Sequence, residues 1–224
     1  MNFDRLAPHY DWLEALSGHR LLQQARTAWL GELSDRTNIA SIGEGHGRFA
    51  EACIVRHPAA ALTCVDTSAA MVERAQKRLA HRATGLRCHH GDVLTWRPEN
   101  RPDALVSCFF LDCFPPEKLA QVVAHLASLA APDVVWLVTD FALPARGPAR
   151  WRAQFIHALM YTFFRCTVQL PARRLTPPDV LLDAHGFTLV ERREFSWGLI
   201  RADVWRRKPE GPAVAADDSG QILK

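Results

Sequence analysis

The segment from Ile39 to Phe49 constrains the possible folds of this chain more than any other stretch. A short apolar run is followed by glycines at positions 43, 45 and 47, and an amphipathic segment begins at Phe49. This order is typical of a strand, a tight turn and the start of a helix. Glycine permits positive φ and close approach of a ligand to the main chain, while the start of a helix presents unpaired N–H groups. We therefore expect a nucleoside cofactor to bind at this turn.

The rest of the chain alternates apolar, strand-like segments with amphipathic helical ones, which indicates βαβ units and a mainly parallel sheet. The apolar strands are nearly continuous, as expected for a sheet covered on both faces. The expected strands are residues 38–42, 61–65, 86–90, 104–110, 134–141, 187–195 and 199–206. The expected helices after residue 48 are residues 49–57, 69–83, 117–129, 149–164 and 179–184. Because a tight connection joins the last two strands, the pattern predicts an α/β fold with a doubly wound, seven-stranded sheet that ends in an antiparallel hairpin.

The length of 224 residues fits one α/β domain with a small addition. We expect a helical lid at residues 1–35, the main domain at residues 36–208 and a disordered tail at residues 209–224. Within the main domain, residues 144–182 are expected to form a helical insertion between the fifth and sixth strands.

The composition argues against several classes of protein. No N-terminal apolar region resembles a signal peptide, and the longest apolar runs are too short to span a bilayer. The six cysteines form no C-x-x-C pair, which favours reduced thiols in a cytoplasmic protein. Cys88, His89 and His90 do not indicate a metal site, because neighbours on a strand point to opposite faces and no second cluster has zinc-ligand spacing.

The basic charge is concentrated in the last third of the chain. Residues 144–208 hold twelve Lys/Arg and five Asp/Glu. Such a segment either places solvated arginines on helix and strand faces or meets an anionic substrate or an acidic membrane surface, and the composition favours the first. Neither a lysine-rich run nor a stacking-aromatic motif indicates a nucleic-acid partner.

Two aspartates support a cofactor site beside the glycine turn. Asp66 ends the second strand, 19 residues after Gly47, where a carboxylate can accept hydrogen bonds from both ribose hydroxyls. Asp92 follows the third strand, where a carboxylate can accept from an adenine amino group. Each feature has a structural alternative, since the glycines can make a simple turn, Asp66 can cap the next helix and Asp92 can start a turn. Their joint position at the carboxyl ends of parallel strands favours cofactor binding.

A dinucleotide site is the main rival. A Rossmann dehydrogenase has the pattern G-x-G-x-x-G, in which the third glycine allows close packing of helix and strand. Arg48 occupies that position here, which weakens the case for an NAD(P)-linked oxidoreductase.

Together these motifs resemble the class I S-adenosylmethionine-dependent methyltransferases, from about Arg36 to Trp205. The resemblance implies a Rossmann-like fold, S-adenosylmethionine as cofactor and S-adenosylhomocysteine as product. The expected cofactor contacts are Gly43, Glu44, Gly45, Gly47, Asp66, Thr67, Met71, Asp92, Val93, Cys108 and Phe109. For Met71, core packing is an equal alternative. One departure from the family is Ser41, which stands where an acid usually helps to hold the methionine amino group, so that Glu44 or water takes this role.

The opening segment, Phe3 to Asp11, is similar to the start of the ubiquinone/menaquinone-biosynthesis methyltransferases. That similarity covers only the lid and does not identify an acceptor. The aromatic residues Phe3, Tyr10 and Trp12 either pack the lid onto the domain or close over the cofactor and exclude water.

Methyl transfer is an in-line attack of a nucleophile on a sulfonium methyl, so the protein mainly aligns the reactants, a contribution worth roughly 7–11 kcal/mol. A general base is needed only if the nucleophile carries a high-pKa proton. The candidates are Asp112, Tyr10, His157 and His46. Asp112 follows the fourth strand and has helix capping near Pro115 as an alternative, while His157 has core packing as an alternative.

We therefore expect a cytoplasmic methyltransferase that acts on a small, apolar or anionic acceptor. The insertion offers residues for an acceptor pocket, although a stripe of this kind is also typical of a helix that packs in a core. These residues are Trp151, Phe155, Met160, Tyr161, Phe164, Arg165, Arg173 and Arg174. An NAD(P)-linked oxidoreductase and a non-catalytic, methyltransferase-like binding module remain as alternatives.

Overall fold

The computed structural model describes residues 19–81 and 85–208. The strands are β1 (Asn38–Ile42), β2 (Ala61–Asp66), β3 (Leu86–His90), β4 (Ala104–Cys108), β5 (Val135–Phe141), β6 (Phe187–Phe195) and β7 (Ile200–Arg207). The α-helices are α2 (His19–Arg26), α3 (Arg48–Arg56), α4 (Ala69–Leu79), α5 (Pro116–Leu129), α6 (Gly147–Val168) and α7 (Asp179–Ala184). Two short 3-10 helices, η3 (Leu30–Leu33) and η4 (Leu111–Cys113), precede β1 and follow β4.

The seven strands form one sheet in the order β3-β2-β1-β4-β5-β7-β6. The first five run parallel, whereas β7 pairs antiparallel with both β5 and β6. The predicted fold class, a mainly parallel, doubly wound sheet with an antiparallel C-terminal hairpin, is confirmed.

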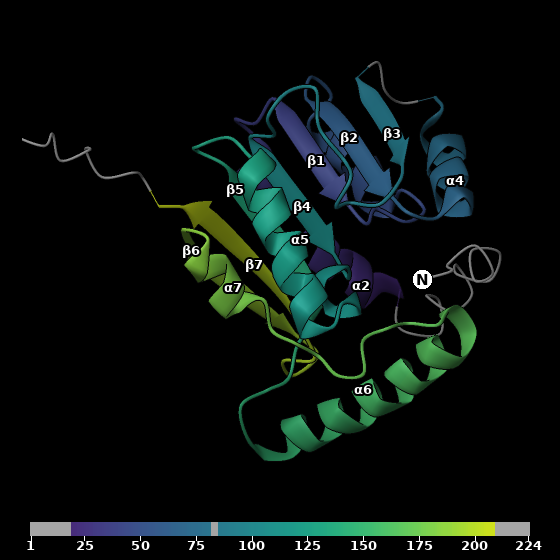
Figure 1. Ribbon diagram of the computed structural model, residues 1–224, viewed down its shortest axis with the longest axis vertical. Helices are drawn as coiled ribbons and strands as arrows, with labels where there is room; N and C mark the ends of the chain where they lie inside the picture. The colour runs from purple at the N-terminus through teal and green to yellow at the C-terminus, as the bar shows by residue number, and fades with distance from the viewer. Residues whose placement is uncertain (1–18, 82–84, 209–224) are drawn as a thin grey trace, which may run out of the picture.

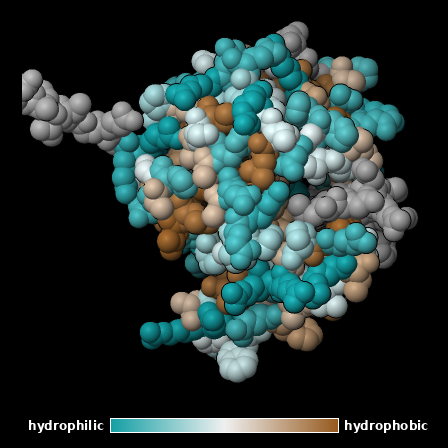
Figure 2. Space-filling model, viewed as in Figure 1, coloured by the Kyte–Doolittle hydropathy of each residue, from teal (hydrophilic) through white to brown (hydrophobic). Residues whose placement is uncertain are grey.

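Apolar layers cover both faces of the sheet. On one face, Leu119, Val122 and Leu126 of α5 and Leu182 of α7 pack against the strands, and these two helices lie in front of the sheet in Figure 1. On the other face, the side chains come from η3, α3 and α4. Hydrophilic residues dominate the surface in the same view (Figure 2), as expected when helices carry their apolar stripes inward.

The strand order places the carboxyl ends of β1 and β4 side by side at the centre of the sheet. From β1 the chain continues to β2 and β3 on one side of β1, and after β3 it crosses back to β4 on the other side. Open α/β sheets bind ligands where the strand order reverses in this way, which here is between β1 and β4. Helix α6 lies beyond this same edge, apart from the two helical layers (Figure 1).

The structure differs from the expected element boundaries in informative places. β4 ends at Cys108, two residues early, because Phe109 has a φ of 54° and turns the chain out of the strand. Helix α6 extends to Val168 and ends where Gln169 adopts a left-handed conformation with a φ of 55°.

The cysteines, the helices and the expected lid lie wholly or partly in the described residues. All six cysteines lie in this part of the chain and carry free thiols. None of the helices in residues 19–81 and 85–208 combines the length and apolar character needed to cross a membrane. Within the expected lid at residues 1–35, α2 and η3 are helical, whereas Phe3, Tyr10, Trp12 and the expected tail lie outside the described residues.

Candidate active site

The glycine turn follows β1 directly, and its three glycines at positions 43, 45 and 47 all have positive φ. At Gly43, a Cβ atom would lie 2.1 Å from Cδ2 of Phe110, so the aromatic ring rests on bare backbone. At Gly47, a Cβ atom would lie 3.1 Å from the Cα atom of Ala75 in α4. Gly43 therefore admits a side chain from the β4 loop, and Gly47 allows the start of α3 to approach α4.

Asp66, the last residue of β2, is hydrogen-bonded to this turn. Its Oδ2 accepts from the backbone N–H of Gly45 at 2.8 Å, and its Oδ1 accepts from the backbone N–H of Ser68 at 2.9 Å. The helix cap is Ser68, whose Oγ accepts from the N–H of Met71 at 3.2 Å. The contact with Gly45 shows that Asp66 does more than begin a helix, because it joins the ends of β1 and β2.

Asp92 shapes the loop after β3. Its Oδ1 accepts from the N–H of Leu94 at 2.9 Å, and its backbone oxygen accepts from the N–H groups of Thr95 and Trp96. The expected turn role is therefore present, and Asp92 also borders a cavity.

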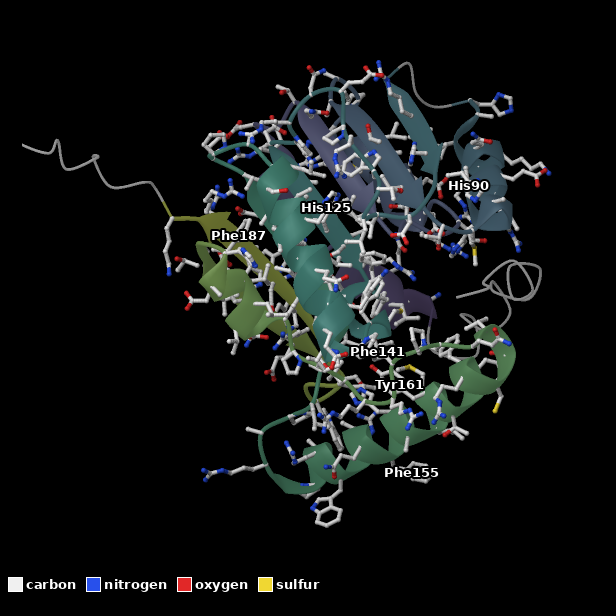
Figure 3. All side chains as sticks on the ribbon, in the orientation of Figure 1. His90, His125, Phe141, Phe155, Tyr161 and Phe187 are labelled. Atoms are coloured by element: carbon white, nitrogen blue, oxygen red, sulfur yellow. The ribbon has the colours of Figure 1, made fainter. Side chains whose placement is uncertain are left out.

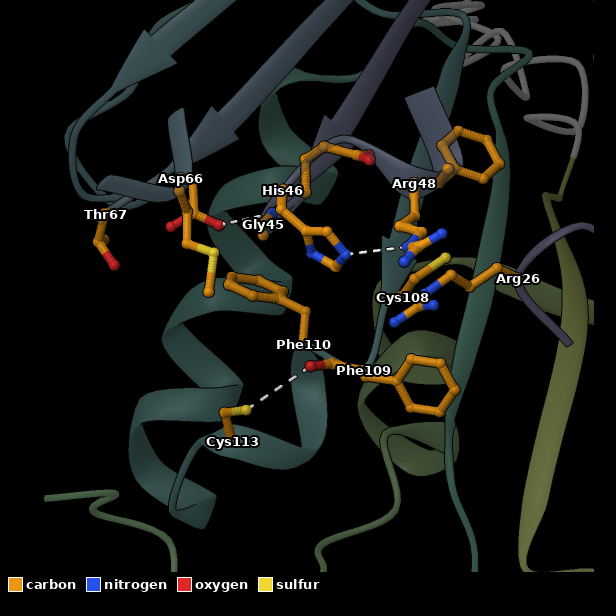
Figure 4. A pocket seen from close by; sticks show the side chains of 14 residues that line it. Arg26, Gly45, His46, Arg48, Asp66, Thr67, Cys108, Phe109, Phe110 and Cys113 are labelled. Carbon is orange, nitrogen blue, oxygen red and sulfur yellow. Dashed lines mark hydrogen bonds between the residues drawn. The ribbon is translucent and has the colours of Figure 1, made fainter. Parts of the chain in front are cut away.

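Two adjoining cavities lie along the carboxyl edge of the sheet, one of about 90 Å³ and one of about 360 Å³. Both are bordered by Gly43, Asp66, Thr67 and Phe110, and Figure 4 shows the smaller one, with the Phe110 ring among its lining side chains. Of the expected cofactor contacts, the smaller cavity brings together Gly43, Glu44, Gly45, Asp66, Thr67, Met71, Cys108 and Phe109. The larger cavity adds Asp92 and Val93. Gly47 borders neither of them and acts through packing instead.

Glu44 occupies the turn with its carboxylate directed back toward β1. The hydroxyl of Ser41 donates to one carboxylate oxygen, and the other accepts from the N–H of Ala50 at 3.0 Å. Burial raises the pKa of Glu44, and these hydrogen bonds oppose the rise. Ser41 stands where the family usually has an acid. Its hydroxyl holds the carboxylate of Glu44 close to that position.

Arg26 is a lining residue that the sequence interpretation missed. It is the last residue of α2, it is 9% exposed, and its guanidinium carbon lies 5.1 Å from the centre of the Phe109 ring. Its positive charge acts to lower the pKa of Glu44. The sequence around Arg26 contains no pattern that indicates a cofactor site. Arg26 reaches the turn only because α2 packs on the domain.

A second carboxyl group lies beside Asp112, namely Asp140 at the end of β5. Both side chains are buried, and the two carboxyl groups are within hydrogen-bonding reach of each other. Oδ1 of Asp140 also accepts from the N–H of Phe110 at 3.0 Å and so holds the loop after β4. The sequence analysis did not identify Asp140. An acid near the carboxyl end of an apolar strand could have indicated it as a site residue.

Burial shifts the titration of both acids in the same direction. It raises the pKa of Asp112 to about 6, and it raises the pKa of Asp140 well above its usual value, with repulsion from Asp112 adding to the effect. Ionised Asp112 therefore disfavours ionisation of Asp140. The capping alternative for Asp112 is excluded, since no side chain caps α5 at Pro115. Asp112 borders neither of the two cavities described above.

His157 and Tyr161 lie on the inner face of α6. The His157 ring is 5.9 Å from that of Phe141 and 6.3 Å from that of Tyr161, and burial lowers the pKa of His157. The Tyr161 hydroxyl donates to the backbone oxygen of Asp112 at 3.1 Å. Figure 3 shows Phe141 and Tyr161 between the sheet and α6, while Phe155 points away from the domain. The structure therefore brings His157 close to the Asp112 region, in a packed aromatic setting.

Known proteins resemble this chain in both sequence and fold. Residues 39–133 match a family model described as a methyltransferase domain. Trans-aconitate 2-methyltransferase from Methylobacterium radiotolerans is 31% identical over 134 residues, which make up 57% of this chain and 48% of that protein. The tRNA1(Val) (adenine(37)-N6)-methyltransferase from Vibrio campbellii is 32% identical over 91 residues, or 40% of this chain and 35% of that protein.

Residues 39–133 are therefore similar to a methyltransferase domain, and the relatives support the expected class I S-adenosylmethionine-dependent methyltransferase. The fold of residues 19–81 and 85–208 agrees with this similarity. Mitomycin 7-O-methyltransferase superposes with a TM-score of 0.71 at 19% identity, covering 93% of this chain and 61% of that chain. The 1,6-didemethyltoxoflavin-N1-methyltransferase of Burkholderia thailandensis, solved with 1,6-didemethyltoxoflavin and S-adenosylhomocysteine, has a TM-score of 0.65 at 17% identity and covers 92% and 85%.

The methyltransferase domain does not by itself identify an acceptor. The chain spans about half or less of the length of the two curated relatives, and their names specify trans-aconitate and a tRNA adenine. Among the described residues of the methyltransferase domain and its extension, no group of His, Cys, Asp and Glu side chains is arranged to hold a metal ion.

Replacement of Asp112 by Asn is expected to stabilise the methyltransferase domain more at pH 7 than at pH 4. The pKa of Asp112 is raised from 3.8 to about 6 in the folded protein. The stability associated with its protonated form is therefore fully present below pH 3.8 and is lost as the pH rises through about 6. The difference between these pKa values corresponds to about 3 kcal/mol, which sets the scale of the pH-dependent gain.

Urea unfolding of the two proteins across this pH range measures the effect. Asp133→Asn provides the control, because the Asp133 side chain is 77% exposed. If the free energy of unfolding of Asp112→Asn differs from that of the parent protein by the same amount at every pH, the expected titration is contradicted.

Proposed function

We propose that this protein transfers the methyl group of S-adenosylmethionine to a small-molecule acceptor by in-line attack on the sulfonium methyl. One observation carries the proposal: the glycine turn, Asp66 and Asp92 border two adjoining cavities at the carboxyl edge of the sheet. A nucleoside with an extended amino-acid arm suits such a pair of cavities. S-adenosylhomocysteine is the expected product.

The cofactor is proposed to lie across the ends of β1, β2 and β3. Asp66 would accept hydrogen bonds from the ribose hydroxyls, since an ionised carboxylate accepts about four such bonds. The adenine would enter the larger cavity beside Asp92 and Val93, and Met71 would contact it from α4. The methionine arm would enter the smaller cavity, where Glu44 faces its ammonium group and Arg26 provides charge opposite to its carboxylate.

The acceptor is proposed to approach from the side of α6. Among the expected acceptor residues, Tyr161 is buried, and Met160 and Phe164 pack against the same small apolar cluster. Trp151 and Phe155 are instead 76% and 72% exposed on the outer face of α6, away from this cluster. An acceptor pocket would therefore use the inner face, with apolar chemistry predominating and arginines at residues 165–174 available to an anionic group.

Catalysis would come mainly from alignment of the acceptor with the methyl group and from exclusion of water. Where the acceptor carries a proton, Asp112 is the proposed general base, because a pKa of about 6 lies close to the operating range of such groups. His157, whose pKa is lowered by burial, would accept a proton as the neutral imidazole. Tyr10 is retained as a candidate from the lid. The six free thiols support a reducing, cytoplasmic compartment.

Calorimetric titration tests the proposal. We expect S-adenosylmethionine and S-adenosylhomocysteine to bind, and methyl transfer to follow by the release of S-adenosylhomocysteine with a panel of small acids, phenols and amines. Undetectable binding of both ligands at millimolar concentration would reject the proposed cofactor. Saturable binding of NADH instead would favour the oxidoreductase, and cofactor binding without transfer to any acceptor would favour the non-catalytic module.

A further inference from the structure

Helix α6 has an apolar face that nothing in the described part of the domain covers. Its inner face buries Ala153, His157, Tyr161 and Val168 against the domain. Its outer face carries an apolar side chain at every fourth position: Trp151, Phe155, Leu159 and Phe163 are 76%, 72%, 66% and 39% exposed. We call these four residues the outer stripe. The helix forms the lower part of the molecule in Figure 2, and Phe155 points away from the domain in Figure 3.

An ordinary surface helix is apolar on one face only. Here the residues that attach α6 to the domain alternate with a second set that faces solvent. Contiguous exposed apolar residues of this size mark interaction surfaces in proteins. The outer stripe is therefore expected to meet an apolar or interfacial medium.

The β6–β7 connection enlarges this surface. Trp197, at the tip of the connection, is 77% exposed. Arg152 of α6 lies 5.6 Å from the centre of the Trp197 ring and donates to the backbone oxygen of Ser196 at 3.0 Å. The hairpin tip is thus attached to the first half of α6, next to Trp151.

The chain segment that carries the outer stripe is basic. Residues 142–178 include six arginines, at positions 146, 150, 152, 165, 173 and 174, and no aspartate or glutamate. A second copy of the chain docked face to face would bring two such basic segments together, which is unfavourable. An anionic surface is complementary to this charge, and amphipathic helices with Trp, Phe and Leu beside Arg bind the interfacial plane of membranes.

We propose that the outer face of α6, together with Trp197, docks on the surface of a membrane that contains anionic lipids. The aromatic rings lie at the level of the headgroups, where Trp is favoured. The arginines extend along the same plane and pair with lipid phosphates. This inference does not rest on the proposed methyl transfer, because it concerns the face of α6 opposite to the cofactor side.

Vesicle sedimentation tests the proposal without any cofactor or acceptor. The full chain is mixed with phosphatidylcholine vesicles that contain about 30 mol % phosphatidylglycerol, and in parallel with pure phosphatidylcholine vesicles. We expect binding to the anionic vesicles, and a loss of about tenfold or more in affinity for the double variant Trp151→Gln/Phe155→Gln. Val55→Gln/Val180→Gln is the matched control, because these two exposed apolar residues lie on α3 and α7.

Four outcomes would overturn the proposal, three of them in the vesicle experiment. The first is no binding to anionic vesicles, and the second is equal binding to neutral and anionic vesicles. The third is an unchanged affinity of the Trp151→Gln/Phe155→Gln variant that circular dichroism shows to be folded. Analytical ultracentrifugation without lipid gives a further check, since a dimer of the parent chain that this variant abolishes would assign the outer stripe to a second copy and overturn the proposal as well.

Discussion

Asp66→Ala is expected to weaken the binding of S-adenosylhomocysteine by about a hundredfold or more. Hydrogen bonds to a charged acceptor contribute roughly 1.5–3 kcal/mol each, and the proposed ribose contact uses two of them, which corresponds to at least a hundredfold in affinity. The substitution also removes the acceptor for the N–H of Gly45, so the glycine turn keeps only its backbone hydrogen bonds to Val65 of β2. Isothermal titration calorimetry measures the loss directly.

A fragment of the ligand shows which part of the site each carboxylate serves. 5′-Methylthioadenosine keeps the ribose and adenine but lacks the amino-acid arm. Asp66→Ala should weaken both ligands, whereas Glu44→Gln should weaken S-adenosylhomocysteine and leave 5′-methylthioadenosine nearly unaffected. Parent-like affinity of folded Asp66→Ala for both ligands would contradict the proposed ribose site, and an equal loss of both ligands in Glu44→Gln would contradict the ammonium contact.

Gly43→Ala is expected to destabilise the domain by about 2–4 kcal/mol and to weaken cofactor binding. The residue has a φ of 67°, a conformation that strains alanine, and its new Cβ would lie 2.1 Å from Cδ2 and 2.7 Å from Cγ of Phe110. The ring has to move, and it borders both cavities. Urea unfolding gives the stability, and calorimetry gives the affinity.

Gly45→Ala separates the two causes of this effect. Gly45 has nearly the same φ, 66°, but no heavy atom lies within 4 Å of its added Cβ. It should therefore show the backbone strain alone, of roughly 1–2 kcal/mol. The double variant Gly43→Ala/Phe110→Ala should lose less stability than the two single changes together, because they remove the same contact. If Gly43→Ala and Gly45→Ala have the same free energy of unfolding, the contact with Phe110 does not contribute to the destabilisation of Gly43→Ala.

The strands and the position of the glycine turn beside Asp66 and Asp92 were predictable because their signals are local. Asp66 ends β2 and Asp92 lies two residues after the end of β3, and the three glycines of the turn indicate positive φ. Parallel strands bring their carboxyl ends to one edge, so three separate local patterns were sufficient to place these residues together. The NAD(P) alternative lost support at Arg48, again from spacing within a single turn.

Other parts of the site depend on contacts between distant segments. Asp140 holds the N–H of Phe110 across 30 residues of chain and shares its buried setting with Asp112. Arg26 reaches Phe109 only because α2 packs beside the sheet. Neither pairing has a signature in spacing or periodicity, since both arise from the order of strands and the placement of a helix.

The inner and outer faces of α6 show the same division. The residue types between Ala149 and Phe164 indicated a helix with an aromatic stripe, but periodicity could not say which side packs on the domain. The tertiary structure decided that His157 and Tyr161 face inward and that Trp151 and Phe155 face solvent. The sequence by itself determined the α/β class, the turn at Gly43–Gly47 and the acids near the ends of β2 and β3, because these depend on backbone conformation and strand periodicity. Only the tertiary structure decided the pairing of Asp112 with Asp140 and the exposure of the outer stripe, because burial and proximity are properties of segments packed together.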